Sequence, residues 1–533
     1  MLTPESSRWG AEHAAPSCCG RDEAASLPES TATPCCGTAE SAHMADSCCD
    51  PEAKSAAIAS GAGCCGPTAA VQSAASTHPA AAARSSSRDL PVVVIGAGPV
   101  GLAAAAHLAE RGMEFLVLEA GAAVASAIEQ WGHVRLFSPW WHDMDAAARR
   151  LLEADGWMAP EPHELPTGAQ LVDAYLGPLA KLPALSSRIR FGHRVTGITR
   201  LGFDRVRSAG RELAPFVVRV AGGQEILARA VIDASGTWRT PNVLGAHGLP
   251  AHGEARAARV GRTVPALPDV LGSDRMRFAD RRTVVVGAGH SAATTLLALA
   301  ELAAAIPGTE PVWAVRGLDP SHAYGGGEVD ELPARGALGR RLRAHVESGA
   351  VELVAGFHTH TVEIGGDRVV LHGRDAAGHD RRLSADQVVN ATGFRPDHTI
   401  ATELRLDLDP ILGSTRALAP LIDPNHHSCG TVPPHGVDEL SHPETGYYAV
   451  GVKSYGRAPT FLLATGYEQV RSVVAALAGD WKAARNVELD LPESGVCSST
   501  ADVACDQETE IGDGLHPLPL VESTTGPDSG GCC

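Results

Sequence analysis

The fold is decided by residues 91–119, which read PVVVIGAGPVGLAAAAHLAERGMEFLVLE. A short apolar strand over 91–95 runs into a glycine turn, and an apolar helix over 100–111 follows and stops at Gly112. A second strand over 115–118 ends at Glu119. This order predicts a compact βαβ unit of the kind that binds a dinucleotide.

The glycine turn itself has the pattern GxGxxG, formed by Gly96, Gly98 and Gly101. Gly96 permits the tight turn, Gly98 lets the backbone approach a pyrophosphate, and Gly101 lets the helix pack closely on the strand. The helix opens with Pro99 and Val100, and its free N–H groups and positive dipole end attract the phosphates. We therefore predict that these five residues bind the cofactor. An ordinary strand–turn–helix without a ligand is the alternative.

A second βαβ unit begins at Arg282, with a strand over 283–286, a glycine turn, a helix over 291–305 and a strand over 311–315. Its turn reads GAGHSA, so alanine replaces the third glycine. The predicted cofactor contacts of this turn are Gly287, Gly289, His290 and Ser291.

The residue that closes each unit predicts which cofactor it binds. Glu119 can accept hydrogen bonds from ribose hydroxyls, and its charge would repel a 2′-phosphate, so the first unit suits FAD or NAD. Arg316 stands at the corresponding place in the second unit, where a guanidinium can pair with a 2′-phosphate. We therefore predict FAD at the first turn and NADPH at the second. A solvated charge at a strand end is the competing interpretation of Arg316.

Two such units in one chain predict an α/β protein: an FAD-binding Rossmann-like domain with an inserted NAD(P)-binding Rossmann-like domain, flanked by disordered cysteine-pair tails. We expect a disordered tail over residues 1–88, because Ala, Ser, Pro and Gly dominate there and cannot form a core. The predicted domains are the FAD domain over 89–250 and 385–486, the NAD(P)H domain over 251–384, and a second disordered tail over 487–533.

Composition excludes several function classes. The formal net charge of the 533 residues is −18, which argues against a general nucleic-acid binder. No window has the apolar run of roughly 18 residues that a membrane span needs, and residues 1–16 lack the apolar core of a secretory signal. We therefore expect no membrane insertion and, by default, a cytoplasmic location.

Three further segments resemble motifs of two-dinucleotide flavoproteins, namely 233–237 (DASGT), 386–397 (DQVVNATGFRPD) and 447–451 with 465–469 (YYAVG and TGYEQ). In that family the last helix points its N-terminus at the flavin. The resemblance implies that Thr392, Gly393, Gly466 and Tyr467 also contact a cofactor.

Within that superfamily the chain most resembles the flavin monooxygenase-like proteins of bacterial arsenic-resistance gene clusters. The resemblance is carried by 131–140 (WGHVRLFSPW), 429–436 (CGTVPPHG) and 453–461 (KSYGRAPTF). Trp131, His133 and Tyr455 are candidates to line the flavin, although core packing would give the same pattern. The FxGxxxHxxxW fingerprint of Baeyer–Villiger monooxygenases is absent, and no CxxC lies between residues 89 and 489. Both departures leave the reaction type open.

Ten of the thirteen cysteines form five adjacent pairs, and adjacent cysteines make strained disulfides. Vicinal thiols bind soft centres such as As(III), Hg(II), Cu(I) or Zn(II). We predict soft metal or metalloid binding by Cys18, Cys19, Cys35, Cys36, Cys48, Cys49, Cys64, Cys65, Cys532 and Cys533. Compositional drift in an unselected tail is the alternative.

Cys429 lies apart from the pairs, close to His426 and His427. A thiol near histidines can be a nucleophile of lowered pKa or a metalloid ligand, so Cys429 is the candidate catalytic residue. A lone cysteine is also often a small buried residue.

These observations lead to three hypotheses. The first is an NADPH-dependent FAD monooxygenase-like enzyme in arsenic or soft-metalloid detoxification. The second is a flavin-dependent metal or disulfide reductase, and the third is a metalloid-sequestering or redox-sensing flavoprotein. The expected partner is a small-molecule or metalloid substrate and not a nucleic acid, and a homodimer is left open.

Overall fold

The computed structural model of the chain describes residues 89–325, 330, 332–425 and 432–489. Outside these residues lie the candidate catalytic Cys429 and both predicted tails, apart from residues 487–489. The described chain contains two parallel five-stranded sheets and two antiparallel three-stranded sheets.

The first parallel sheet contains the βαβ unit that opens the described chain. Its order is β16 (Tyr447–Ala449), β7 (Ala230–Asp233), β1 (Val92–Ile95), β2 (Phe115–Leu118) and β3 (Ile189–Arg190). Every neighbouring pair in this order is parallel. The strands predicted over 91–95 and 115–118 are therefore confirmed to within one residue.

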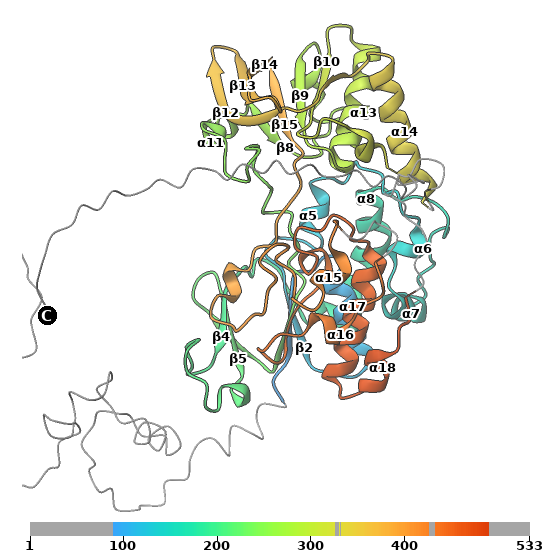
Figure 1. Ribbon diagram of the computed structural model, residues 1–533. Coiled ribbons are helices and arrows are strands. Elements are labelled where there is room, and N and C mark those ends of the chain that lie inside the picture. The colour runs from blue at the N-terminus through green and yellow to red at the C-terminus, as the bar shows by residue number, and fades with distance from the viewer. Residues whose placement is uncertain (1–88, 326–329, 331, 426–431, 490–533) are drawn as a thin grey trace, which may run out of the picture. The chain divides into compact units, whose positions relative to one another are not determined.

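Both faces of this sheet are buried. Val92 and Val94 of β1 pack with the helices α4 (Pro99–Glu110) and α17 (Leu463–Leu477), whereas Val93 and Ile95 pack on the other side. That other side is covered by the antiparallel sheet β4 (Val195–Arg200), β5 (Phe216–Val220) and β6 (Glu225–Ala228) (Figure 1). Because side chains alternate along a strand, a strand covered on both faces has to be apolar throughout.

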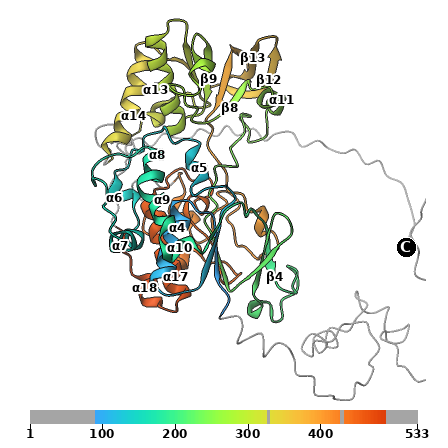
Figure 2. The same ribbon diagram turned by 180° about the vertical axis from the view of Figure 1, so that it is seen from behind.

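The second parallel sheet repeats this arrangement. Its order is β11 (Glu352–Val354), β10 (Glu310–Ala314), β9 (Arg282–Val286), β15 (Gln387–Asn390) and β8 (Thr263–Pro265). The helices α13 (His290–Ala305) and α14 (Pro333–Glu347) lie on one side. The antiparallel sheet β12 (His358–Gly365), β13 (Arg368–Arg374) and β14 (Asp380–Ala385) lies on the other (Figures 1 and 2).

Chain order establishes that the second module is inserted into the first. All strands of the second sheet lie between residues 263 and 390, and β7 and β16, which are neighbours in the first sheet, flank that stretch. The predicted α/β class with an inserted dinucleotide-binding domain is therefore confirmed.

The predicted boundary before residue 385 is wrong in position. Strand β15 pairs in parallel with β9 and β8, so it belongs to the inserted sheet and not to the second part of the first module. The physical reason is that 387–389 is a short apolar strand buried in a parallel sheet. The sequence of such a strand does not indicate which of two parallel sheets it joins.

The two chain segments that connect the modules are paired with each other. Pro241 and Phe394 form an antiparallel bridge. The Arg395 N–H donates to Thr240 O (2.9 Å), and the Asn242 N–H donates to Gly393 O (2.8 Å). The inserted module is thus joined to the first one by two chain segments that are hydrogen-bonded to each other.

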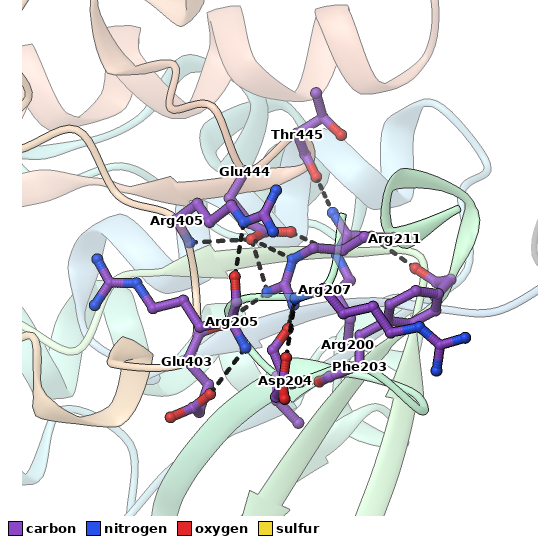
Figure 3. Close-up of polar contacts among 12 residues, drawn as sticks. Arg200, Phe203, Asp204, Arg205, Arg207, Arg211, Glu403, Arg405, Glu444 and Thr445 are labelled. Carbon is purple, nitrogen blue, oxygen red and sulfur yellow. Dashed lines mark hydrogen bonds and ion pairs between the residues drawn. The ribbon is translucent and has the colours of Figure 1, made fainter. Parts of the chain in front are cut away.

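A buried ionic cluster holds the antiparallel sheet β4–β6 to the segment before β16 (Figure 3). Glu444 receives hydrogen bonds from Arg200 Nε (2.7 Å) and Arg211 Nη2 (2.9 Å), and all three side chains are less than 5 % exposed. Arg211 Nε (3.2 Å) and the Arg405 N–H (3.0 Å) also donate to Glu444. Although burial opposes it, these hydrogen bonds lower the pKa of Glu444.

Shorter elements complete the described chain. They are α5 (Ser126–Glu129), α6 (Trp140–Asp143), α7 (Ala146–Ala154), α8 (Gly168–Leu171), η1 (Val172–Leu176), α9 (Gly177–Lys181), α10 (Pro183–Ser186), η2 (Arg211–Leu213), α11 (Glu254–Arg259), α12 (Arg275–Phe278), η3 (Ser321–Tyr324), η5 (Thr399–Ala401), α15 (Ala419–Ile422), α16 (Val437–Leu440), η6 (Gly451–Lys453) and α18 (Trp481–Arg485). Within the described ranges, no helix has both the length and the apolar character to cross a membrane.

Candidate functional site

A cavity of about 560 Å³ opens at the carboxyl ends of β1, β2, β7 and β16. The carboxyl ends of parallel strands are where open α/β sheets bind their ligands. Predicted cofactor residues that line this cavity are Gly96, Gly98, Pro99, Val100 and Glu119.

The first glycine turn has the geometry that its sequence predicts. Gly96 has a φ of +99°, and a Cβ added there would lie 2.7 Å from Ala234 O. A Cβ on Gly101 would lie 2.0 Å from Gly96 O, so the helix packs on the turn too closely for a side chain. A Cβ on Gly98 would meet no atom within 4 Å, because this backbone faces the cavity. The turn thus leaves open the position that a pyrophosphate needs.

Glu119 lies at the cavity wall and is held by the backbone. The Ala97 N–H donates to Glu119 Oε2 (2.8 Å), and the Gly121 N–H donates to Oε1 (2.7 Å). Because each carboxylate oxygen can accept a second hydrogen bond, the side chain is oriented and still able to receive ribose hydroxyls. It fits the predicted contact with adenosine ribose.

The second glycine turn repeats the close approach of the first. Gly287 has a φ of +138°, and a Cβ there would lie 2.1 Å from Ala391 O, at the end of the neighbouring strand β15. Gly289 again faces open space and precedes α13, in whose first turn His290 and Ser291 lie. This turn can therefore also bring its backbone close to a phosphate.

Thr392 and Gly393 follow β15 on the same side. The Thr392 hydroxyl donates to Asn390 Oδ1 (2.7 Å), and Gly287 approaches the Thr392 N–H. Neither residue is among those that line the cavity of the first module, so they belong beside the second turn. Their contact with a cofactor stays a prediction.

Arg316 follows β10 and is exposed. Its Nη1 donates to Ala246 O (3.0 Å), which anchors one edge of the guanidinium. A guanidinium carries five N–H donors, so the exposed remainder is available to an anion. The position agrees with the role predicted for this residue, and its ligand stays a prediction.

An aromatic contact joins the start of α13, after the second glycine turn, to a residue that lines the cavity of the first module. The ring of Phe137, which lines the cavity of the first module, lies 5.0 Å from the ring of His290. The guanidinium of Arg335 lies 6.0 Å from the Phe137 ring. Desolvation and the charge of Arg335 lower the pKa of His290, so this ring is neutral at pH 7.

Sequence reasoning missed a buried ion pair at the cavity. Lys453 lines the cavity, and its Nζ lies 2.6 Å from Asp233 Oδ2, with side chains 1 % and 0 % exposed. The hydroxyl of Tyr447 also donates to this carboxylate (2.9 Å), and Lys453 Nζ donates to Ser235 Oγ (3.1 Å). Burial opposes ionisation of Asp233, but the Lys453 charge lowers its pKa. Both residues belong to segments that resemble family motifs, Asp233 to 233–237 and Lys453 to 453–461, but nothing in the sequence indicates that they form an ion pair.

The remaining aromatic candidates separate into two groups. Trp131 lines the cavity, 6.4 Å from the ring of Trp238, whereas His133 is exposed and is absent from the lining. Tyr455 is buried against Phe461, with the two rings 5.3 Å apart, and is also outside the lining.

Gly466 and Tyr467 lie near the start of α17, but the lining residue of that helix is Leu463. A Cβ on Gly466 would lie 2.6 Å from the side chain of Val100, and the Tyr467 hydroxyl donates to Asp143 O (2.7 Å). Both residues therefore pack the helix against the module, and their direct contact with a cofactor stays a prediction.

The predicted thiol sites cannot be placed. Cys429 and the ten paired cysteines lie outside the described residues, and the described residues contain no cysteine. Within the described ranges, no group of three or more His, Cys, Asp or Glu side chains could hold a metal ion.

Comparison with known proteins agrees with this arrangement. A family model described as pyridine nucleotide-disulphide oxidoreductase matches residues 93–410, which is more than half of the chain. A search of curated protein sequences gives no significant match.

Solved structures with a similar fold include bacillithiol disulfide reductase from Bacillus cereus, with 19 % identity and a TM-score of 0.50 over 73 % of this chain and 99 % of that one. They also include the FAD-bound cadaverine monooxygenase of desferrioxamine biosynthesis from Erwinia amylovora, with 14 % identity and a TM-score of 0.53 over 76 % and 98 %. At these identities the likeness concerns the fold.

The family match spans both glycine turns, and the two turns lie on nested parallel sheets with a cavity at the first. The chain therefore belongs to the pyridine nucleotide-disulphide oxidoreductase family of FAD- and NAD(P)-binding flavoproteins.

Proposed function

We propose that this flavoprotein is an NADPH-dependent FAD oxidoreductase that passes electrons to oxygen, in the manner of a monooxygenase, and that its substrate is a soft trivalent metalloid such as an arsenical. The proposed electron path from NADPH to FAD rests on the two βαβ units, each with a glycine turn. The first unit ends at Glu119, which lines the cavity, and the second ends at the exposed Arg316.

The residues of the first module fit FAD. Gly98 leaves space for the pyrophosphate, the N-terminus of α4 faces it, and Glu119 is oriented for the ribose. Bound FAD supplies a two-electron acceptor for the hydride of a nicotinamide. The buried Lys453–Asp233 pair contributes an oriented ammonium group to the same wall.

The preference for NADPH over NADH rests on charge. A 2′-phosphate needs a cation, and Arg316 offers its free guanidinium edge at the end of β10. An acidic residue at this place would favour NADH.

The choice of oxygen over a disulfide rests on the cysteines. A reductase that passes electrons through a redox-active dithiol needs two thiols in reach of the flavin, and Cys429 is the only cysteine between residues 89 and 489. None of the described residues that line the cavity is a cysteine.

The substrate class rests on the five vicinal cysteine pairs. As(III) prefers thiolate ligands, and one pair supplies two of them. This distribution favours a thiophilic substrate that the paired cysteines bind and the flavin oxidises.

The test is NADPH turnover by the full chain with a panel of trivalent arsenicals, measured with and without oxygen. The proposal expects turnover that is stimulated by an arsenical and stops without oxygen. If oxygen is consumed with other substrates but no arsenical has an effect, the substrate class is wrong.

The second candidate is a metal or disulfide reductase, favoured by the terminal pair Cys532–Cys533. This pair resembles the C-terminal pair that hands metal to the active site in mercuric reductase. The same experiment separates the two functions, because a reductase continues to turn over without oxygen.

A further inference from the structure

Asp143, at the end of α6, is a carboxylate with one satisfied oxygen and one unsatisfied oxygen. The residue is 1 % exposed. Ser138 Oγ donates to Oδ1 (2.7 Å), whereas Oδ2 is buried and has no hydrogen-bond partner among the described residues. A buried carboxylate that served only to hold the fold would be expected to have both oxygens bonded.

Ser138 connects this buried carboxyl to the candidate cofactor cavity. Ser138 is among the residues that line the cavity, as is its neighbour Phe137, and its hydroxyl donates to Asp143, which is not a lining residue. A hydroxyl has one proton to donate and two lone pairs to accept with. Ser138 can therefore bond to Asp143 and to a group in the cavity at the same time.

The surroundings of Asp143 favour its neutral form. Burial raises its pKa from 3.8 to about 7, and the hydrogen bond from Ser138 opposes this rise. The other titratable groups that face it from η1 and α17 are Tyr175 and Tyr467, whose pKa values burial raises well above 10, so both are neutral.

The other titratable groups near Asp143 have partners of their own. Asp145 accepts from the Ala148 N–H (2.9 Å) and lies 3.0 Å from His107 Nε2. The ring of His142, next in the chain, lies 3.4 Å from the ring of Trp141. No ion pair of Asp143 with a Lys or Arg side chain of the described chain holds the carboxylate in its charged form.

We propose that Asp143 and Ser138 form a proton relay at the wall of the cofactor cavity, in which Asp143 stores the proton and Ser138 delivers it. With Asp143 ionised, the Ser138 hydroxyl donates to Oδ1 and presents lone pairs to the cavity. With Asp143 protonated, the carboxyl O–H donates to Ser138 Oγ, and the Ser138 proton turns toward the cavity.

The transfer balances without any change in oxidation state. The Ser138 O–H proton moves to a basic oxygen or nitrogen in the cavity as the Asp143 proton moves to Ser138 Oγ. Asp143 ends as the carboxylate and regains its proton between turnovers through Ser138, from water that enters the cavity. Asp143 thus acts through Ser138 and is a positioning residue, and Ser138 is the group that faces the reacting atoms.

The first test does not need a bound cofactor. Infrared titration of the full chain should show a protonated-carboxyl C=O band that is lost with a midpoint near pH 7, as the pKa of Asp143 requires. Asp143→Asn should remove this band. Ser138→Ala should keep the band and raise its midpoint, because the Ser138 hydrogen bond lowers the pKa. Asp155→Asn, at an exposed acid after α7, should leave the band unchanged.

The second test rests on the proposed binding of FAD in the cavity. The rate of reoxidation of dithionite-reduced flavin by oxygen should rise in the unaltered chain as pH falls through the same midpoint. In Asp143→Asn and in Ser138→Ala this pH dependence should be lost. Both variants should still bind FAD and should melt at nearly the same temperature as the unaltered protein.

Three outcomes would decide the matter. A missing neutral-pH band, or a band that persists in Asp143→Asn, overturns the stored proton. A normal band with an unchanged reoxidation profile in Ser138→Ala overturns the relay. A protein that holds no flavin refutes the proposed function and leaves the infrared result to stand separately.

Discussion

Gly98 and Gly101 lie three residues apart in the first glycine turn, but a methyl group added to each meets different surroundings. On Gly98 it would face open cavity, whereas on Gly101 it would lie 2.0 Å from Gly96 O. We expect Gly98→Ala to leave the unfolding free energy of the flavin-free chain nearly unchanged and to weaken FAD retention. Gly101→Ala should lower that free energy by about 1–3 kcal/mol, because the overpacked contact is backbone. Chemical denaturation of both variants, with flavin content measured in parallel, tests the difference, and equal destabilisation would contradict it.

Arg316 is the residue on which the proposed preference for NADPH rests. If Arg316 binds the 2′-phosphate as proposed, removing its guanidinium removes a charge-assisted contact to a group that NADH lacks. We expect Arg316→Ala to raise KM for NADPH about tenfold or more, equivalent to roughly 1.5–3 kcal/mol for a charged hydrogen bond, with KM for NADH unchanged. Arg262→Ala is a suitable control, since Arg262 lies before β8 and pairs weakly with exposed Asp367 (3.7 Å). Equal changes in KM for both nucleotides would assign Arg316 a structural role.

Asp143 should also make the unfolding free energy depend on pH. Because its pKa is raised in the folded state, the folded protein binds more protons than the unfolded one between the two pKa values. The unfolding free energy should therefore fall as pH rises from 3.8 to about 7, by roughly 4 kcal/mol at most. Asp143→Asn should flatten this part of the pH profile of the denaturation midpoint. An unchanged slope in the variant would contradict the raised pKa.

Residue by residue, the sequence predicted contacts that are local and missed those that are not. Gly96, Gly98 and Gly101 are recognisable because their roles depend on spacing within one turn. Lys453 and Asp233 lie 220 positions apart, and the burial that makes their pairing consequential depends on the packing of β7 against β16. The same holds for Asp143, whose unsatisfied oxygen is a product of tertiary packing.

At the scale of elements, the cluster around Glu444 is what joins the antiparallel sheet β4–β6 to the segment before β16 (Figure 3). We expect Glu444→Ala to lower the unfolding free energy by about 3–5 kcal/mol, because two buried guanidinium groups lose their counter-charge. Glu225→Ala is the matched control, since its pair with Arg219 lies in the same sheet with side chains 45 % and 60 % exposed. That change should cost under about 1 kcal/mol. Similar losses in denaturation experiments on both variants would contradict the structural role of the cluster.

Elements were predicted best where periodicity and turn chemistry agree. The helix expected over 291–305 is α13, His290–Ala305, and the strand expected over 115–118 is β2, Phe115–Leu118. The sheet to which β15 belongs could not be predicted, because parallel pairing joins segments distant in the sequence. The antiparallel sheets were missed for a different reason. Strands such as β14 are mostly exposed and polar, so their sequence lacks the apolar pattern that indicates a strand.

For the whole molecule, the segments proposed for electron transfer and for metalloid binding lie in different parts of the sequence. Both sheets, both glycine turns and the cavity lie within residues 89–489, whereas four of the five cysteine pairs lie within residues 1–88. The two activities should therefore be separable by truncation.

Removal of residues 1–88 tests this separation. We expect the truncated chain to retain FAD and to oxidise NADPH with an unchanged kcat, because the first described strand begins at Val92. Its binding capacity for As(III), measured by equilibrium dialysis, should fall sharply, because eight of the ten paired cysteines are gone. The full chain with those eight cysteines changed to serine should behave like the truncated one, since it keeps the segment and loses only the thiols. An unchanged As(III) capacity in either protein would show that the metalloid binds elsewhere, and loss of FAD in the truncated chain alone would give the segment a structural role in the first module.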